Sequence, residues 1–306
     1  MDRHSRHVIP QSGILEAGNQ YWTPANRTPQ RGVTRAGVTL GKKSFKYMQI
    51  FHMNKQSQLV SVDPSMTVLA YEERLGQEGF TGGYFPSLGL NVSMNECLLE
   101  RIPNYWFLKF GGIEELCVGG EAHSFRNKNF IMKTVPRSAT GADLKRVVLG
   151  SHGNLAHFKT VVLRIFPTID YETWGFFSVQ NPHEGFAFLK ELMGQFVRPL
   201  FASVEKMGTL KKVLGEVFSD QGPYGFYLKL AGFERLVSAE KEVVSEVCRG
   251  TKIYWTDHPE RRVILDQHLI TPQSYARLID GMKDFYRNDV NTEIVEEEKR
   301  VLKVFG

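Results

Sequence analysis

RSATGADLKRVVLGSHGNLAHFKTVVLRIFP, residues 137–167, is the stretch with the clearest structural signals in the chain. Thr140 is a typical helix N-cap, and Asp143 would follow in the first turn, where a carboxylate interacts favourably with the positive end of the helix dipole. Gly150 predicts that this helix ends at Leu149. The stretch therefore predicts a helix, a tight turn and then a strand.

The strand at the end of this stretch spans residues 157–167, which are rich in β-branched side chains. Its alternation places three apolar residues on one face: Val161, Leu163 and Ile165. Pro167 ends the strand and predicts a boundary between two domains, 1–167 and 168–306. With 306 residues, of which 42% are hydrophobic, the chain is long enough to bury two cores.

Upstream of the stretch, LVSVDP at 59–64 predicts a short strand that ends in a turn. MTVLAYEERLGQEGF at 66–80 predicts a strand that merges into a helix, with Gly79 at its end. Three residues of this helix are expected on successive turns of one face: Leu69, Glu73 and Leu75. GGIEELCVGGEAH at 111–123 predicts a turn, a strand and a second turn.

Downstream of Pro167, strands and helices alternate. Strands are predicted at 171–180, 199–206 and 225–233. Asn181 followed by proline predicts a helix start. The apolar residues of this helix recur at helical spacing: Phe186, Leu189, Met193 and Phe196.

A second helix is predicted at 238–250, where Ser238 begins an incomplete capping box because Lys241 stands in place of Glu. The tail from Thr271 is predicted to be mostly helical. The alternation indicates a small α+β domain of ferredoxin-like type.

Composition limits the classes of partner. The net charge of +5 favours anionic partners in general but is too dilute to indicate nucleic-acid binding. Cys97, Cys117 and Cys248 lie far apart, in no spacing that suits zinc or an iron–sulfur cluster, and fit a reducing compartment. No apolar run reaches the length of a membrane span. We therefore expect a soluble cytoplasmic protein without a metal site.

The run at 137–167 resembles the FAD-binding segment of the vanillyl-alcohol-oxidase superfamily, also called PCMH-type. The pattern of that segment reads roughly R-S-A-T-G-P-D-L and then L-x-x-G-S-E-G-T-L-G. The resemblance is to the branch of glycolate oxidase FAD subunits, D-lactate dehydrogenases and alkyl-dihydroxyacetone-phosphate synthase. The residues of this chain that fit are Arg137 to Gly141, Asp143, Leu144, Gly150, Ser151, Gly153 and Leu155.

Other segments follow in the family's order. FLKFGGIEELCVGGE, residues 107–121, resembles the run R-Y-G-x-I-E-D, and HVIPQSGILEAG at 7–18 lies where the diphosphate loop P-x-G-G-G-T-S would be. The resemblance covers most of residues 8–250, with its strongest part at 60–167. Compared with the family, the chain looks truncated before the diphosphate loop and in the cap domain.

The resemblance implies a PCMH-type FAD-binding domain followed by a partial cap domain, with FAD as cofactor. Glycine-rich loops let backbone amides approach the two phosphates closely. No catalytic or metal-binding residue is identified. The residues implied in cofactor binding are Ser12, Gly13, Pro86, Ser87, Ser93, Gly111, Gly112, Ile113, Ser138, Thr140, Gly141, Asp143, Gly150, Ser151, Gly153, Asn154 and Leu155.

Each of the three cofactor loops departs from the family pattern. The first has one glycine, and Ile14 would crowd the phosphates. The second has Met94 and Asn95 where relatives have a glycine pair. The third reads His152-Gly153-Asn154-Leu155-Ala156 instead of E-G-T-L-G, and it is the best preserved of the three.

Several side chains have two interpretations. His152 and His157 could tether a flavin or act as a base, or they could be surface residues. An aromatic cluster could stack on a flavin or adenine or belong to the core: Trp106, Phe107 and Phe110.

Two functions follow from the resemblance. The first is an FAD-binding subunit of a flavin-dependent oxidoreductase, related to 2-hydroxy-acid dehydrogenases or an electron-transfer complex, that assembles with flavin or iron–sulfur subunits. The second is a cofactor-free structural subunit that supports a complete partner. A third possibility is that the old flavin cleft binds another anionic nucleotide.

Overall fold

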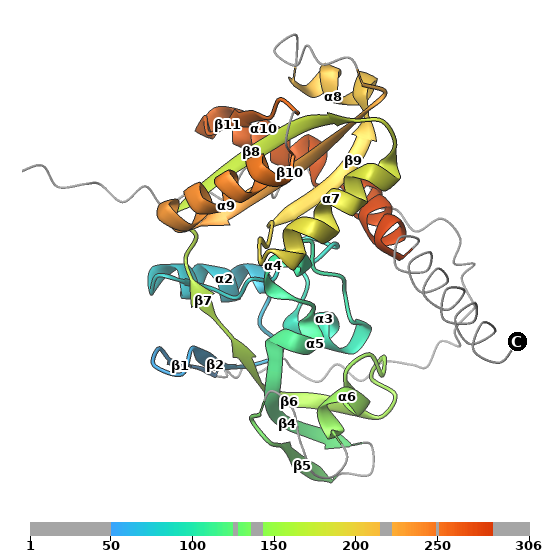
Figure 1. The fold of residues 1–306 in the computed structure, drawn as a ribbon. Coiled ribbons are helices and arrows are strands. Elements are labelled where there is room, and N and C mark those ends of the chain that lie inside the picture. Colours follow the sequence, from blue (N-terminus) through green and yellow to red (C-terminus); the bar gives the residue numbers. More distant parts are fainter. Residues whose placement is uncertain (1–49, 125–127, 136–142, 215–221, 249–250, 284–306) are drawn as a thin grey trace, which may run out of the picture.

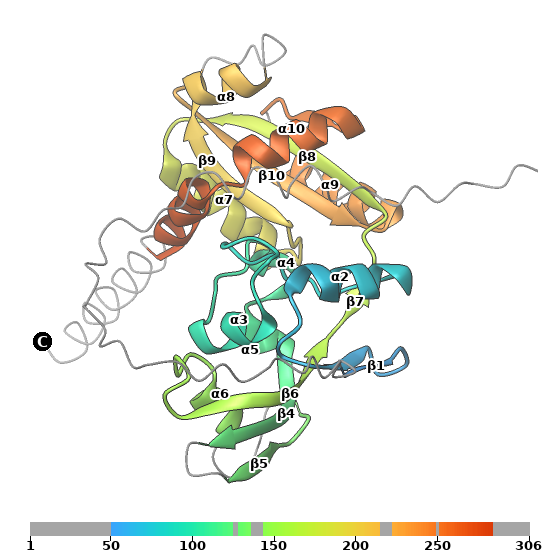
Figure 2. The same ribbon diagram turned by 180° about the vertical axis from the view of Figure 1, so that it is seen from behind.

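The structure is a computed structural model that describes residues 50–124, 128–135, 143–214, 222–248 and 251–283. Figures 1 and 2 show two parts, one above the other, each with its own sheet. One hydrophobic core lies within residues 60–165, and a second joins residues 174–278 with Leu108. The predicted domain boundary at Pro167 stays a prediction.

The first part is built on an antiparallel sheet with the strand order β1-β2-β6-β4-β5. Its strands are β1 (Phe51–Asn54), β2 (Leu59–Val62), β4 (Cys117–Ser124), β5 (Asn129–Met132) and β6 (Ala156–Arg164). The strands predicted at 59–64 and 157–167 are confirmed as β2 and β6. Val161, Leu163 and Ile165 are buried on one face, as the alternation predicts.

Five short helices accompany this sheet: α2 (Val68–Gln77), α3 (Met94–Glu100), α4 (Phe107–Phe110), α5 (Ile113–Leu116) and α6 (Leu144–Val148). The Thr67 side chain caps α2, which buries Val68, Tyr71 and Leu75. Glu73, expected one turn after Leu69, is exposed. The core-facing stripe instead follows Val68 at intervals of three and four residues.

The segment 111–123 differs from its prediction. The helix α5 occupies its first half, and β4 continues through Gly119 and Gly120, where a second turn was predicted. The β4–β6 register shifts on either side of these glycines, which is a β-bulge. Gly120 has φ 145°, and a Cβ there would lie 2.3 Å from the Thr160 carbonyl oxygen. The glycines therefore permit a close approach of neighbouring strands.

The helix predicted within 137–167 is confirmed as α6. Its N-cap position is Asp143, and Leu149 is the C-cap residue, followed by Gly150 with φ 73°. The predicted cap, Thr140, lies outside the described residues.

The second part has a four-stranded antiparallel sheet with the order β11-β8-β10-β9. Its elements are β8 (Tyr171–Val179), α7 (Pro182–Gly194), β9 (Phe201–Lys206), α8 (Met207–Leu214), β10 (Tyr224–Gly232), α9 (Glu234–Val247), β11 (Tyr254–Thr256) and α10 (Pro259–Leu269). A strand–helix–strand, strand–helix–strand order with this pairing is ferredoxin-like. The predicted α+β class is confirmed.

Asn181 caps α7, as predicted, by accepting a hydrogen bond from the Glu184 amide. The predicted apolar stripe is correct at Phe186 and Leu189 but wrong at Phe196. Phe196 follows the helix with φ 65°, and it is 84% exposed.

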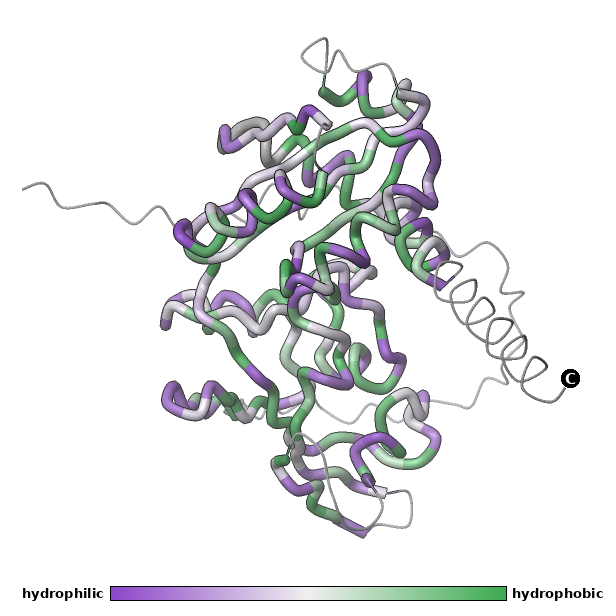
Figure 3. Tube along the Cα trace, in the orientation of Figure 1, coloured by the Kyte–Doolittle hydropathy of each residue, from purple (hydrophilic) through white to green (hydrophobic). Residues whose placement is uncertain are grey.

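The helix α9 begins at Glu234, four residues before the predicted start at Ser238. The Ser238 hydroxyl is inside the helix and donates to the Glu234 carbonyl oxygen at 2.9 Å. Hydrophobic and hydrophilic residues alternate along α9 in Figure 3, and its buried face carries Val237 and Val244.

The two parts touch through Leu108 of α4, which lies in the second core, and through an aromatic contact. A short ribbon belongs to the first part, whose core packs against Phe80 and Phe166. The strands β3 (Phe80–Thr81) and β7 (Phe166–Pro167) pair with each other. The ring of Tyr275, on the helix at 272–283, makes edge contacts with Tyr105 at 5.2 Å and Phe107 at 5.8 Å between centroids. None of the helices described is both long and apolar enough for a membrane span.

Candidate functional site

The candidate site is the set of loops that the sequence assigns to a dinucleotide. Five of its residues lie outside the described part of the chain: Ser12, Gly13, Ser138, Thr140 and Gly141. Ile14 lies outside it as well. Among the remaining residues, Ser93 lies at the start of α3, which is about 10 Å long at 1.5 Å per residue, and Gly150 lies beside its end.

The second loop closes on itself through a capping box. The Glu96 carboxylate accepts hydrogen bonds from the Ser93 amide at 2.9 Å and from the Ser93 hydroxyl at 2.7 Å. The Ser93 Oγ in turn accepts from the Glu96 amide at 3.2 Å. These bonds hold the pKa of Glu96 below its ordinary value. A carboxylate of the chain therefore already occupies the Ser93 amide at the start of α3.

The other amides of this loop are also bonded. The Met94 amide donates to the Met66 carbonyl at 2.9 Å, and the Asn95 amide donates to the Pro64 carbonyl at 2.8 Å. The Met94 side chain is fully buried in the core of the first part. The residues that replace the glycine pair thus anchor α3 to the turn before α2.

Backbone amides before and after this loop also donate hydrogen bonds to groups within the chain. The Ser87 amide, next to Pro86, donates to the Pro103 carbonyl at 2.9 Å. The Gly112 amide donates to the Glu115 carboxylate at 2.8 Å.

The Gly111 amide donates to the Phe107 carbonyl at 2.9 Å, and Ile113 is buried in the core. The amides of Ser87, Ser93, Gly111 and Gly112 therefore each donate to a group of the chain itself.

The Asn104 side chain holds these loops together, and no motif in the sequence indicated this role. Its amide nitrogen donates to the Gly83 carbonyl at 3.0 Å and the Gly111 carbonyl at 2.8 Å. Its side-chain oxygen accepts from the amides of Phe85 at 2.9 Å and Trp106 at 3.0 Å. The side chain is buried, so these four bonds satisfy it fully. A single asparagine outside any motif gives no signal in sequence.

The third loop, 150–155, folds over the end of α3. The Gly150 amide donates to the Leu98 carbonyl and the His152 amide to the Leu99 carbonyl, both at 3.1 Å. A Cβ on Gly150 would lie 2.6 Å from Nε of Arg101, so this arginine covers the glycine.

The rest of the third loop is held by local bonds. The Ser151 amide donates to the Val148 carbonyl at 3.1 Å, and the Asn154 amide donates to the Ser151 carbonyl at 2.9 Å. Gly153 has φ 71°, and Leu155 is 52% exposed. Asp143, at the start of α6, pairs with Arg146 at 3.5 Å.

The side chains with two interpretations lie at the surface or in packing contacts. His152 is exposed and pairs with Glu100 at 2.5 Å, and His157 is exposed as well. The ring of Trp106 stacks on Phe85 at 5.5 Å.

Phe110, the last residue of the aromatic cluster, packs against Phe166 at 4.7 Å between ring centroids. The geometry favours surface and packing roles for these residues.

A buried carboxyl that no motif indicated lies between α2 and β3. Glu72 accepts from the Thr81 hydroxyl at 2.8 Å and from the Gly82 amide at 3.0 Å. Burial raises the pKa of Glu72 to about 7, and the two hydrogen bonds oppose that shift. The neighbouring Tyr71 hydroxyl is buried without a hydrogen-bond partner in the described structure.

The second part buries a lysine between carboxylates. Lys229 on β10 pairs with Asp266 of α10 at 2.8 Å and with Glu172 of β8 at 3.0 Å. The Trp174 indole also donates to Asp266 at 3.1 Å. Burial lowers the pKa of Lys229, but the two carboxylates outweigh burial and raise it overall. The network fixes α10 to the sheet.

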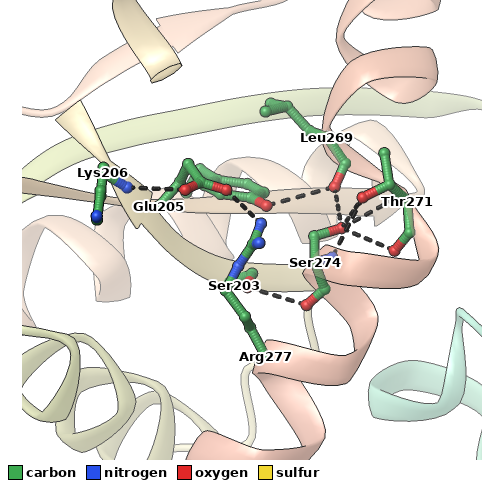
Figure 4. A network of polar contacts seen from close by, with 8 residues as sticks. Ser203, Glu205, Lys206, Leu269, Thr271, Ser274 and Arg277 are labelled. Atoms are coloured by element: carbon green, nitrogen blue, oxygen red, sulfur yellow. Dashed lines mark hydrogen bonds and ion pairs between the residues drawn. The ribbon is translucent and has the colours of Figure 1, made fainter. Parts of the chain in front are cut away.

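A second polar network, drawn in Figure 4, fixes the helix at 272–283 to the same sheet. The Thr271 amide donates to the Ser274 hydroxyl at 2.9 Å, and the Ser274 amide donates to Thr271 Oγ1 at 3.2 Å. The Ser203 hydroxyl on β9 donates to the Ser274 carbonyl at 3.2 Å, and Arg277 pairs with Glu205. These contacts hold the helix to the sheet.

The described residues contain no group of three or more His, Cys, Asp and Glu side chains placed to hold a metal ion. The three cysteines are free and buried: Cys97, Cys117 and Cys248.

Comparison with known proteins finds similarity to a synthase and to an FAD-linked oxidoreductase. The chain is 27% identical over 271 residues to alkyldihydroxyacetonephosphate synthase of Caenorhabditis elegans, covering 87% of this chain and 42% of the synthase. It is 25% identical over 155 residues to the FAD-linked oxidoreductase YgcU of Escherichia coli strain K12, covering 50% of this chain and 32% of that protein. No family model matches the chain.

The comparison with solved structures finds the same synthase. A structure of alkyldihydroxyacetonephosphate synthase superimposes with a TM-score of 0.56 and 15% identity, over 72% of this chain and 44% of the synthase. The resemblance to this flavoprotein branch is confirmed. The α+β FAD-binding fold is confirmed with it. The chain spans less than half the length of the curated relatives it matches.

Proposed function

We propose that this chain has a flavin-dependent, oxidoreductase-like function as a subunit whose own loops at 86–113 and 150–155 do not hold FAD. The similarity to the synthase and to an FAD-linked oxidoreductase supports the flavin-dependent class. The observation that carries the finer proposal is the start of α3, where the Glu96 carboxylate and two carbonyls accept the amides of Ser93, Met94 and Asn95.

The physical reason is competition for donors. A diphosphate binds a loop through backbone amides that have no partner within the chain. At the start of α3 these amides are satisfied, and releasing those of Met94 and Asn95 would leave the carbonyls of the buried residues Met66 and Pro64 unpaired, at a cost of about 1–3 kcal/mol each. Glu96 would also repel a phosphate at close range. The subunit would thus support a partner that carries the flavin.

The second candidate is an FAD-binding subunit, which is the first function that the resemblance implies. It is favoured by the run Arg137 to Gly141, which fits the family pattern position by position. In this case residues 137–141, with Ser12 and Gly13, would supply the phosphate donors. When bound, FAD would supply the redox chemistry and the protein its position and electronic environment.

One experiment separates the two candidates. The full chain is purified from cells supplied with riboflavin, its visible spectrum is recorded, and apo protein is then titrated with FAD by tryptophan fluorescence. We expect a colourless protein and no saturable quenching. A flavin spectrum or tight FAD binding that is abolished by Gly141→Val would overturn the proposal and establish the second candidate.

The matched control for that variant is Gly194→Val at the end of α7, where a Cβ meets nothing within 4 Å. The subunit role is tested by co-expression with a complete flavoprotein of the same branch and measurement of mass by light scattering. We expect a hetero-oligomer. A chain that stays monomeric beside such a protein contradicts the subunit role.

A further inference from the structure

The strand β5 is the outer strand of the five-stranded sheet. Among the described strands it pairs only with β4, so the backbone groups along its other edge face no described strand. Ile131, in the middle of β5, is 74% exposed. An edge of this kind is a template on which an extended segment of another chain can add as a further strand.

Two lysines flank this edge, Lys128 before β5 and Lys133 after it, and both are exposed. Neither forms an ion pair in the described structure. Other cations at this end of the sheet are paired: Lys159 with Glu121 at 3.2 Å and Arg146 with Asp143 at 3.5 Å. The charges of Lys128 and Lys133 are therefore available for ion pairs with a partner protein.

The charges of these two lysines also determine which kind of strand can pair with β5. Antiparallel pairing of β5 with β5 of a second copy would place Lys128 opposite Lys133, and like charges directly opposite each other are destabilising. A strand with acidic residues five positions apart would instead place a carboxylate beside each lysine. We propose that the edge of β5, residues 128–133, docks an extended acidic-flanked segment of a partner protein by strand addition.

This proposal rests on the subunit role given above and names the surface that such a subunit would use. It does not depend on whether FAD is bound, because β5 contributes no residue to the predicted cofactor loops. Loss of FAD binding and loss of strand docking can therefore be measured separately on the same protein.

The test uses two fluorescein-labelled peptides, Glu-Val-Thr-Val-Thr-Glu and Lys-Val-Thr-Val-Thr-Lys, titrated with the full chain and followed by anisotropy. We expect the acidic peptide to bind about tenfold more tightly, as two cross-strand charge pairs would give. The double variant Lys128→Glu with Lys133→Glu is expected to reverse the preference.

The control is Lys159→Glu, which reverses a single lysine charge on β6, away from the edge. It is expected to leave the preference as in the parent chain. Both variants alter exposed residues, and circular dichroism verifies that they fold. Equal affinity for the two peptides, no saturable binding of either, or a preference that survives the double charge reversal would overturn the proposal, and the lysines would then only protect the edge from self-association.

Discussion

The two parts of the molecule bury acidic side chains in opposite ways. In the first part, Glu72 is buried against neutral donors, the Thr81 hydroxyl and the Gly82 amide. In the second part, Asp266 is buried against the cation of Lys229 and the Trp174 indole. Burial raises the pKa of both acids, but at Glu72 only neutral hydrogen bonds oppose the shift, whereas at Asp266 the Lys229 cation opposes it. The contribution of Glu72 to stability therefore depends on pH, whereas that of Asp266 depends on the presence of Lys229.

The largest expected effect is in the second part. Lys229→Met removes the cation that pairs with Asp266 and leaves this buried carboxylate without it. We expect a loss of about 3–5 kcal/mol in the free energy of unfolding, measured by urea denaturation, because an unpaired buried charge is costly. Lys159→Met, at the exposed pair with Glu121, is the control and should cost about 0–1 kcal/mol.

If the cost arises from unpaired charge, neutralising the partners in the same chain should recover most of it. The triple variant Lys229→Met, Asp266→Leu, Glu172→Gln is expected to approach the parent stability. A triple variant as unstable as Lys229→Met would show instead that packing under α10 is responsible, and the comparison with Glu72 would lose its basis.

The next effect is the pH dependence of the first part. The pKa of Glu72 in the fold is about 7, above its value of 4.5 when unperturbed. The unfolded chain therefore releases this proton at lower pH, so the contribution of Glu72 is full below pH 4.5 and is lost as pH rises towards 7. At 1.36 kcal/mol per unit the loss is about 3 kcal/mol at most.

Glu72→Gln removes this titration and keeps a side-chain acceptor for the Gly82 amide. The free energy of unfolding of the parent should fall more steeply between pH 4.5 and 7 than that of the variant. Parallel profiles would mean that Glu72 is solvated in the fold and that the contrast between the two parts is wrong.

A smaller effect tests how tightly the Glu72 site is packed. A Cβ on Gly82 would lie 2.3 Å from Cε1 of Tyr71 and 2.8 Å from Oε1 of Glu72. Gly82→Ala is expected to lower the stability by about 1–3 kcal/mol through overpacking. Gly76→Ala in α2, where a Cβ meets nothing within 4 Å, should instead stabilise by up to about 1 kcal/mol. Similar effects in both variants would contradict a packed site.

The smallest expected effect concerns an exposed carboxylate. Ser93→Ala removes the hydroxyl that caps α3 and binds Glu96, and it should cost about 0.5–2 kcal/mol in thermal or urea unfolding. Ser87→Ala is the control, because Ser87 is bonded through its backbone amide. An unchanged stability in Ser93→Ala would weaken the proposal that this cap competes with a diphosphate.

Much of the fold could be predicted from local signals. Asn181 followed by proline gave the start of α7, Gly150 gave the end of α6, and alternation gave the buried face of β6. These features depend on residues close together in the chain, where capping and pleating act directly. Two of the predictions that were wrong, the turn at Gly119 and Gly120 and the helix start at Ser238, depend on neighbouring strands and helices that local rules do not contain.

The candidate site likewise has features that the sequence determined and features that only the fold decided. By itself, the sequence determined the flavoprotein resemblance, the loops that replace glycines and the α+β class, because motif spacing and residue type are local properties. Only the tertiary structure decided that Glu96 and the Met66 and Pro64 carbonyls occupy the amides of the second loop, and that Glu72 and Lys229 are buried with different partners. A hydrogen-bond donor bonds to an acceptor that the fold brings within about 3 Å, and the order of residues in the chain does not specify which acceptor that is.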